Sequence, residues 1–190
     1  MKICNAYLKS ATPYSQSRIP QVPKLDKETA DAFEQRTWRE KAHSDDKGNV
    51  YIPAMAFKQA IDKAASMLGV QIPGRGKSTY TKHFLAGCIV ENDVTITQDG
   101  KPVLKDKVVA ERIYANADGK RGSGKRVWRI FPTIPKWEGV ARFVIFDDAI
   151  TKGIFEQHLS EAGKYVGVGR FRAENGGLYG RFLVEKFKWE

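Results

Sequence analysis

An apolar pattern with helical spacing between residues 53 and 68 sets the strongest limit on the fold of this chain. The apolar side chains recur at positions i, i+3, i+4, i+7 and i+11: Phe57, Ala60, Ile61, Ala64 and Leu68. Pro53 suits the first turn of a helix, and Gly69 suits the position that ends one. The pattern therefore predicts an amphipathic helix with a defined start and end.

Strand patterns lie on both sides of this helix, as alternating or short apolar runs bounded by turn residues. The predicted strands cover residues 2–10, 87–97, 108–115, 127–134, 139–147 and 181–189. A second amphipathic helix is predicted for residues 150–162, with short helices within 26–41 and from Ser78.

Six of these elements follow the order strand, helix, strand, strand, helix, strand, which is the βαββαβ order of a ferredoxin-like fold. We expect an α+β protein with an antiparallel sheet and two helices on one of its faces. The whole chain, 1–190, is expected to form one domain, with insertions at 11–52 and 69–107 and a basic hairpin tip at 116–126. The second insertion is expected to add at least one further strand.

The charge balance of the 190 residues favours a polyanionic partner. Lys and Arg together number 32 against 22 Asp and Glu, which gives a formal net charge of +10. An isoelectric point near 9.6 is typical of nucleic-acid-binding domains. Cys4 and Cys88 lack motif spacing and predict buried free thiols in a reducing compartment. Because no apolar run reaches the length of a membrane span, we expect a cytoplasmic protein without a membrane partner.

The predicted hairpin between residues 116 and 129 combines cations, glycines and an aromatic ring. Cations neutralise phosphates and release counterions, while an aromatic face stacks a base. The candidate nucleic-acid-binding residues here are Lys120, Arg121, Lys125, Arg126, Trp128 and Arg129. The alternative is a solvated turn whose charges serve solubility.

The stretch 163–182 is rich in glycine and interleaves arginines with aromatic residues. Glycines let backbone amides approach a phosphate closely. The candidate binding residues are Arg170, Phe171, Arg172, Tyr179 and Arg181. The alternative is a glycine-turn hairpin whose aromatic rings pack into the core, as we expect for Phe182.

The loop 74–82 provides a third group of candidates, Arg75, Lys77, Tyr80 and Lys82. It is not a P-loop, because Gln71 occupies the required first glycine position and a helix precedes the loop. A weaker basic patch includes Tyr14 and Arg18.

Catalytic and metal-binding patterns are sparse, so no catalytic residue, metal or cofactor is predicted. His158 lies between core positions of the second helix and is expected to be a packed histidine. The one cluster suited to phosphodiester cleavage is His43 with Asp45 and Asp46, and its alternative is a polar turn.

The segments YIPAMAFKQAIDKAA (51–65) and GVGRFRAENGGLYGRF (167–182) resemble the RAMP superfamily, which builds the crRNA-binding backbone of CRISPR effector complexes. Ile52, Pro53 and Lys58 match the I-P-x-S-x-K segment of these proteins, although Ala54 and Ala56 stand at its serine positions. The resemblance implies a ferredoxin-like or RRM-like core. The whole chain also resembles small bacteriophage proteins of uncharacterised role.

The leading hypothesis is a non-enzymatic, phage-encoded protein that binds single-stranded DNA or RNA with low sequence specificity. Copies of the chain are expected to assemble side by side along the strand. Two alternatives stay open: a ribonuclease of RAMP type, using one of Asp26, Asp31, Asp45 or Asp46, and a phage inhibitor that binds a host CRISPR complex.

Overall fold

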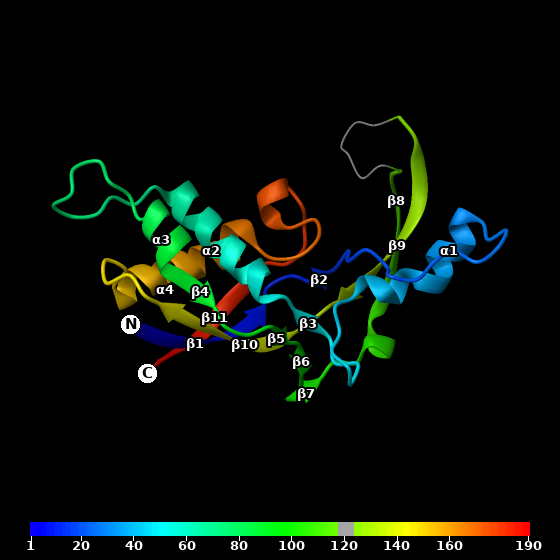
Figure 1. The fold of residues 1–190 in the computed structure, drawn as a ribbon, viewed down its shortest axis with the longest axis horizontal. Coiled ribbons are helices and arrows are strands. Elements are labelled where there is room, and N and C mark those ends of the chain that lie inside the picture. Colours follow the sequence, from blue (N-terminus) through cyan, green and yellow to red (C-terminus); the bar gives the residue numbers. More distant parts are fainter. Residues whose placement is uncertain (118–123) are drawn as a thin grey trace.

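Four strands form the centre of an antiparallel sheet in the computed structural model, which describes residues 1–117 and 124–190 (Figure 1). Across the sheet they are β11 (Phe182–Trp189), β1 (Lys2–Ser10), β10 (Glu138–Ile145) and β4 (Cys88–Val90). Numbered along the chain, the fourth strand lies beside the first, the first beside the third and the third beside the second. This is the strand order of the ferredoxin-like fold that the βαββαβ pattern predicts.

The helices α2 (Ala54–Leu68) and α4 (Lys152–Glu161) cover one face of this sheet (Figure 1). The helix α2 ends where the sequence predicts, at Gly69, whose φ of 55° lies in the left-handed region that glycine adopts without strain. Its first free amide, that of Ala54, donates a hydrogen bond of 2.8 Å to Asp93. Both helix ends are therefore determined by particular residues.

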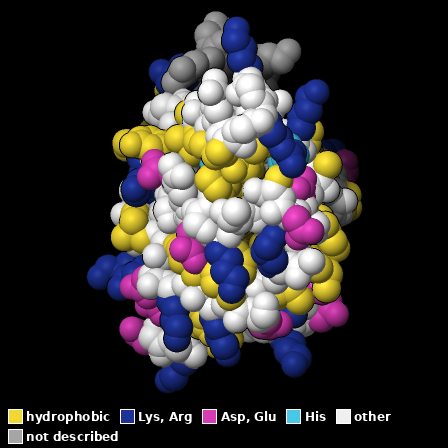
Figure 2. Space-filling view, turned by 90° about the vertical axis from the view of Figure 1, so that its left-hand side faces the viewer, with side chains coloured by type: hydrophobic (Ala, Val, Ile, Leu, Met, Phe, Trp, Pro, Cys, Tyr) yellow, Lys and Arg dark blue, Asp and Glu magenta, His cyan; other side chains and the backbone are white. Residues whose placement is uncertain are grey.

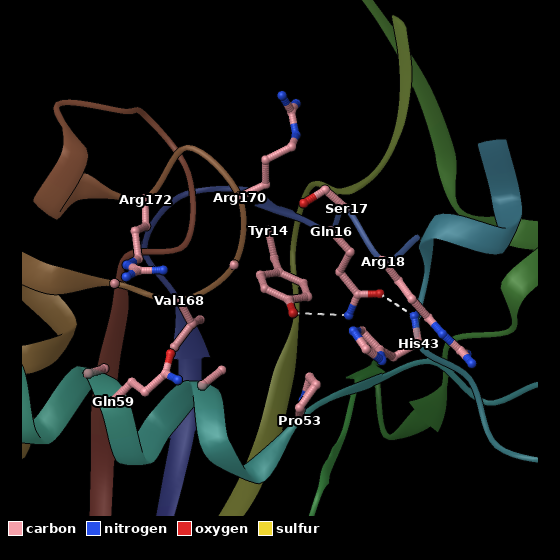
Figure 3. A pocket seen from close by; sticks show the side chains of 14 residues that line it. Tyr14, Gln16, Ser17, Arg18, His43, Pro53, Gln59, Val168, Arg170 and Arg172 are labelled. Atoms are coloured by element: carbon pink, nitrogen blue, oxygen red, sulfur yellow. Dashed lines mark hydrogen bonds between the residues drawn. The ribbon is translucent and has the colours of Figure 1, made fainter. Parts of the chain in front are cut away.

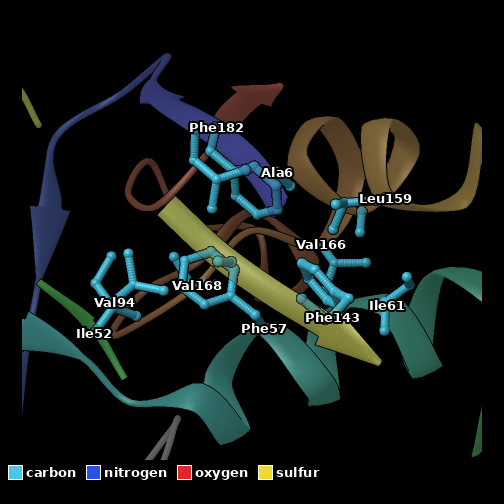
Figure 4. Close-up of a cluster of buried hydrophobic side chains, with 14 of the residues drawn as sticks. Ala6, Ile52, Phe57, Ile61, Val94, Phe143, Leu159, Val166, Val168 and Phe182 are labelled. Atoms are coloured by element: carbon cyan, nitrogen blue, oxygen red, sulfur yellow. The ribbon is translucent and has the colours of Figure 1, made fainter. Parts of the chain in front are cut away.

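The core lies between these helices and the sheet (Figure 4). Phe57 of α2 meets Phe182 of β11 edge-to-face, with ring centroids 5.5 Å apart. Phe143 of β10 packs in the same way against Phe155 of α4 at 5.1 Å. All four rings are 0% exposed, so the apolar helix faces read from the sequence are the faces that the sheet buries.

The remaining elements surround this centre. The strands are β2 (Tyr14–Ser15), β3 (Tyr51–Ile52), β5 (Val94–Thr95), β6 (Thr97–Gln98), β7 (Lys101–Pro102), β8 (Val109–Asn116) and β9 (Arg126–Ile134). The helices are α1 (Ala30–Thr37), α3 (Thr81–Gly87), 3₁₀ turns at Trp38–Lys41, Lys105–Lys107 and Ala173–Asn175, and a π-helical turn at Ala162–Val166.

The structure corrects one assignment of strands to the core. The predicted insertion 69–107 contains β4, whose three residues pair with β10 and complete the central sheet. The longer strands β8 and β9 pair with each other, and β9 also pairs with β2, outside the central sheet. The expected insertion 69–107 left the core strands to later residues, because strand pairing depends on contacts between distant segments that periodicity does not report.

Two local predictions are confirmed, the buried free cysteines and the packed His158. Cys4 and Cys88 are unpaired and fully buried, and burial raises the pKa of both thiols to about 12. His158 is fully buried and stacks on Phe84, with ring centroids 4.5 Å apart. No helix in the described part of the chain is both long and apolar enough to cross a membrane.

Candidate functional site

A pocket of about 240 Å³ opens between the N-terminal half of α2 and the glycine-rich stretch (Figure 3). The segment after β1 and the loop before β3 complete its wall. The lining residues are Tyr14, Gln16, Ser17, Arg18, His43, Pro53, Ala56, Gln59, Ala60, Gly167, Val168, Gly169, Arg170 and Arg172. Elements far apart in the sequence therefore meet at this place.

Glycines allow the glycine-rich stretch to lie directly against β2. Gly169 has a φ of 82°, and a Cβ atom there would come within 2.4 Å of the Tyr14 ring and 2.5 Å of the Ser15 carbonyl oxygen. The next amide, that of Arg170, donates a hydrogen bond of 2.9 Å to that same carbonyl. Only glycine fits at this position, because it tolerates both the positive φ and the close approach.

Gln16 is buried beside the pocket, and its side chain connects three of the surrounding segments by hydrogen bonds. The Gln16 amide donates to the Tyr14 hydroxyl at 3.0 Å and to the Tyr51 carbonyl at 2.7 Å, and it accepts from the His43 backbone amide at 2.6 Å (Figure 3). The bonds to Tyr51 and His43 join Gln16 to segments that lie far from it in the sequence. The side chain of Gln16 is thus fully used in positioning the wall that carries His43.

Other polar groups of the pocket are available to a ligand. The Gln59 amide, exposed on α2, makes no hydrogen bond to the residues that the structure describes. The His43 ring is half-buried, and burial together with the nearby Arg18 charge lowers its pKa. The ring is therefore neutral at pH 7 and offers one donor and one acceptor.

Two arginines lie on opposite sides of the pocket (Figure 3). Arg172 lies on the same side of the pocket as Gln59 and is oriented by Glu174, which accepts its Nε–H at 2.9 Å. Arg18 lies near His43 on the other side. Among the described residues that line the pocket, none is Asp or Glu, so the lining carries a net positive charge, although Arg172 is paired with Glu174, which lies outside the lining.

Arg170 lines the same pocket with its backbone, but its side chain points away (Figure 3). This side chain is only 7% exposed, and it pairs with Glu111 of β8 at 3.5 Å. Its guanidinium lies 3.7 Å from the centre of the Phe131 ring, and Tyr179 donates a hydrogen bond to Glu111 beside it. The side chain of Arg170 thus joins the glycine-rich stretch to the hairpin, and little of it is open to a strand.

Tyr179 belongs to the same internal cluster. Burial, followed by the hydrogen bond to Glu111, raises the pKa of its phenol to about 12. Phe171, by contrast, is 50% exposed next to this cluster. Arg181 donates from Nε to the Lys164 carbonyl at 3.0 Å and so helps to hold the backbone.

The β8–β9 hairpin carries a row of alternating cations and rings on one face. Tyr114 lies opposite Trp128 in the register, and their ring centroids are 5.3 Å apart. Arg112 lies 4.8 Å from the centre of the Trp128 ring, and Arg126 lies 5.4 Å from that of Tyr114. We call these four residues the hairpin ladder. Both rings are 50% exposed, so the ladder is open to solvent.

The other hairpin candidates have different environments. Lys125 is exposed beside the ladder, whereas Arg129 pairs with the buried carboxylate of Glu34 at 3.4 Å. Lys120 and Arg121 lie outside the described residues. The predicted role of the hairpin in binding stays a prediction.

The loop 71–82 lies at the other end of the molecule from the hairpin (Figure 1). Tyr80 is 4% exposed and packs edge-on against His158, so it belongs to the core and not to a contact surface. Arg75, Lys77 and Lys82 are exposed there. On this end of the molecule, Lys and Arg side chains are dispersed among Asp and Glu side chains (Figure 2). These cations are therefore separate from the pocket.

Asp45, one of the acidic candidates for cleavage, lies in a polar turn. Asp45 accepts hydrogen bonds from the Lys47 and Asn49 backbone amides, at 2.9 and 2.8 Å, and one from the Asn49 side chain. These bonds lower the pKa of Asp45 and fix its carboxylate within the turn. Within residues 1–117 and 124–190, no group of three His, Cys, Asp or Glu side chains could hold a metal ion.

Sequence reasoning missed the importance of three pocket residues. From the sequence alone, Arg18 belongs only to a weaker basic patch, His43 is only a candidate for cleavage, and Gln59 is not a candidate at all. No local signal distinguishes Gln59 from other exposed helix residues. Gln59 lines the pocket because α2 packs against the glycine-rich stretch.

No protein-family model and no curated protein sequence matches this chain. Among solved structures, a chain in the cryo-EM structure of the Type III-B Cmr-beta bound to cognate target RNA matches with a TM-score of 0.58 and 14% identity. The match covers 99% of this chain and 60% of that one, so this chain spans about 60% of its length. Cmr6 from Pyrococcus furiosus matches with a TM-score of 0.50 and 14% identity, over 97% and 98% of the two chains. These matches confirm the α+β, ferredoxin-like fold that the sequence predicts.

Proposed function

We propose that this protein binds a single strand of nucleic acid, and RNA in preference to DNA, along a surface that joins the pocket to the hairpin ladder. The observation that carries the proposal is the placement of Arg18 and Arg172 on opposite sides of a pocket whose described lining holds no carboxylate. A strand that crosses the pocket would bring its phosphates between these cations.

The hairpin supplies the second part of the surface. Trp128 and Tyr114 are half-exposed, and Arg112 and Arg126 each lie over one face of a ring and orient it, so a base would stack on the other face at low entropic cost. Base stacking on such rings contributes roughly 1–3 kcal/mol for each base and tolerates any sequence. Phosphate contacts carry no base information either. Binding would therefore show little sequence specificity outside the pocket.

Two observations favour RNA and an assembly with other subunits. The fold is shared with a chain from a structure bound to cognate target RNA, at 14% identity, and with Cmr6. We include in the proposal that copies of this chain, or chains of the same fold, lie side by side along the strand.

Binding without cleavage is the activity that we propose. The carboxylate of Asp45 is used within its own turn, and no carboxylate of the described residues is hydrogen-bonded to the His43 ring to orient it as a base. The pocket thus offers cations that could bind a strand, whereas its described lining lacks an oriented acid and base that could cleave one.

A salt titration of binding tests this proposal. Fluorescence anisotropy of a labelled single-stranded RNA, measured at several salt concentrations, gives the slope of log K against log salt. The double variant R18A/R172A should reduce that slope by about 0.7 for each phosphate that is no longer neutralised. The matched control is R75A/K77A, which removes the same charge from the other end of the molecule and should leave the slope unchanged. Equal slopes for the two variants would contradict the proposed site, and so would equal affinity for duplex and single strand.

A further inference from the structure

The pocket contains groups that a phosphate alone does not need. Arginines and backbone amides suffice to bind a phosphate, yet the pocket also presents the Gln59 amide and the His43 ring from opposite walls (Figure 3). Its volume of about 240 Å³ lies below the ~300 Å³ of pockets for drug-sized ligands. The space is therefore of a size that suits one small group such as a single base.

We propose, as a consequence of the function proposed above, that this pocket receives one unstacked nucleobase of the bound strand, with the Gln59 amide hydrogen-bonded to the edge of that base. The flanking phosphates then lie toward Arg18 on one side and Arg172 on the other. The strand is held at this nucleotide by both its base and its backbone.

The hydrogen-bonding groups of the pocket match this ligand. A carboxamide offers one donor and one acceptor side by side, and the edges of nucleobases carry the same combination. The competing partner of Gln59 is water, because no described residue bonds to its amide. The neighbouring glutamine, Gln16, is excluded from this role because it is buried and its amide is used by Tyr14, Tyr51 and His43.

The walls of the pocket suit the faces of a base. Pro53 and Val168 present apolar surface to the pocket (Figure 3). The neutral state of His43 adds no further positive charge beside the base, which keeps the interior less cationic than the rim. A base therefore enters the pocket while phosphates stay at its rim.

The test separates contacts to the base from contacts to the backbone. Wild type and Q59L are titrated at low salt with a short single-stranded RNA and with an abasic strand of the same length. Q59L keeps the approximate size of the side chain and removes its hydrogen bonds. We expect it to weaken binding of the intact RNA by about three- to tenfold and to leave binding of the abasic strand unchanged.

The matched control is Q157L, because Gln157 is an exposed glutamine on α4 outside the pocket. It should change neither affinity. As a second measurement, the side-chain amide NMR signal of Gln59, assigned by its disappearance in Q59L, should shift on binding the intact RNA and not on binding the abasic strand.

The outcomes distinguish this inference from the proposed function. If both strands bind with salt-dependent affinity and Q59L affects them equally or not at all, the pocket does not hold a base, while strand binding stands. If the intact RNA does not bind at all, the proposed function and the inference fail together.

Discussion

Arginines that look equivalent in the sequence have opposite roles in the structure. Arg170 and Arg172 are two residues apart and both are ion-paired, yet the side chain of the first is 7% exposed and paired with the distant Glu111, whereas that of the second is 32% exposed, paired with the nearby Glu174, and lines the pocket. The difference arises from Glu111, which lies on β8 and is separated from Arg170 by 59 residues. Because Glu111 also accepts from Tyr179 and Thr133, it connects the hairpin to the glycine-rich stretch.

Removing the charge of Glu111 should therefore destabilise the protein. E111Q keeps the size of the side chain but leaves the buried guanidinium of Arg170 without its counter-ion. The expected decrease is about 1–3 kcal/mol in the free energy of unfolding, measured by urea denaturation. The control is E185Q, which breaks the exposed pair with Lys9 and should cost less than about 1 kcal/mol. A decrease no larger than that of E185Q would show that the Glu111 cluster does not hold the hairpin.

His158 should make the free energy of unfolding of the protein depend on pH. Its Nδ1–H donates to the Ile154 carbonyl at 2.7 Å, and its Nε2 has no partner among the described residues. Burial lowers its pKa below the ordinary value of 6.5. The unfolded chain therefore binds a proton below that pH while the folded chain does not, and the free energy of unfolding falls as the pH decreases.

This dependence should be weaker in H158F, which replaces the imidazole by an apolar ring among Phe84 and Tyr80. Urea denaturation between about pH 7 and pH 5 measures it for both proteins. An equally steep pH dependence in H158F would assign the effect to another group, such as His43, whose pKa is also lowered.

At the scale of elements, the β8–β9 hairpin is the part of the molecule best prepared for stacking. Antiparallel pairing places Tyr114 and Trp128 opposite each other, so their rings share one face, and an arginine lies over each ring. Two of the other tryptophans are much less exposed: Trp38 is 7% and Trp137 is 1% exposed. A base that stacks on the hairpin ladder should therefore quench the fluorescence of Trp128 above all.

We expect single-stranded RNA to quench the tryptophan emission of the wild type and to quench that of W128F far less. The control is W189F, since Trp189 packs against Phe155 and donates to Glu156, away from the hairpin. Quenching that persists in W128F would place the stacked base elsewhere.

At the scale of the whole molecule, most elements could be predicted from periodicity. The strand 2–10, the helix after Pro53 and the strand that contains Phe182 all form where the patterns indicate. The assignment of strands to the core could not be predicted in full, because β4 is only three residues long and joins the sheet through pairing with β10. Pairing between distant segments has no local signal.

The candidate site could be predicted only in part, for the same reason. Glycine, arginine and aromatic residues drew attention to the stretch 163–182, which lines the pocket, and to the hairpin. They did not show that Tyr80 packs in the core or that Arg170 forms an internal ion pair. They also did not show that the loop 71–82 lies at the far end of the molecule (Figure 1). Burial and distance are properties of the folded chain.

The proposed function depends above all on the path of the strand, which photo-cross-linking can trace. A single-stranded RNA that carries 4-thiouridine is bound, irradiated and digested, and the cross-linked peptides are identified by mass spectrometry. We expect cross-links in residues 126–134 and 167–179, where the hairpin ladder and the pocket lie. Cross-links concentrated in residues 71–82, with none in those two segments, would contradict the proposed path.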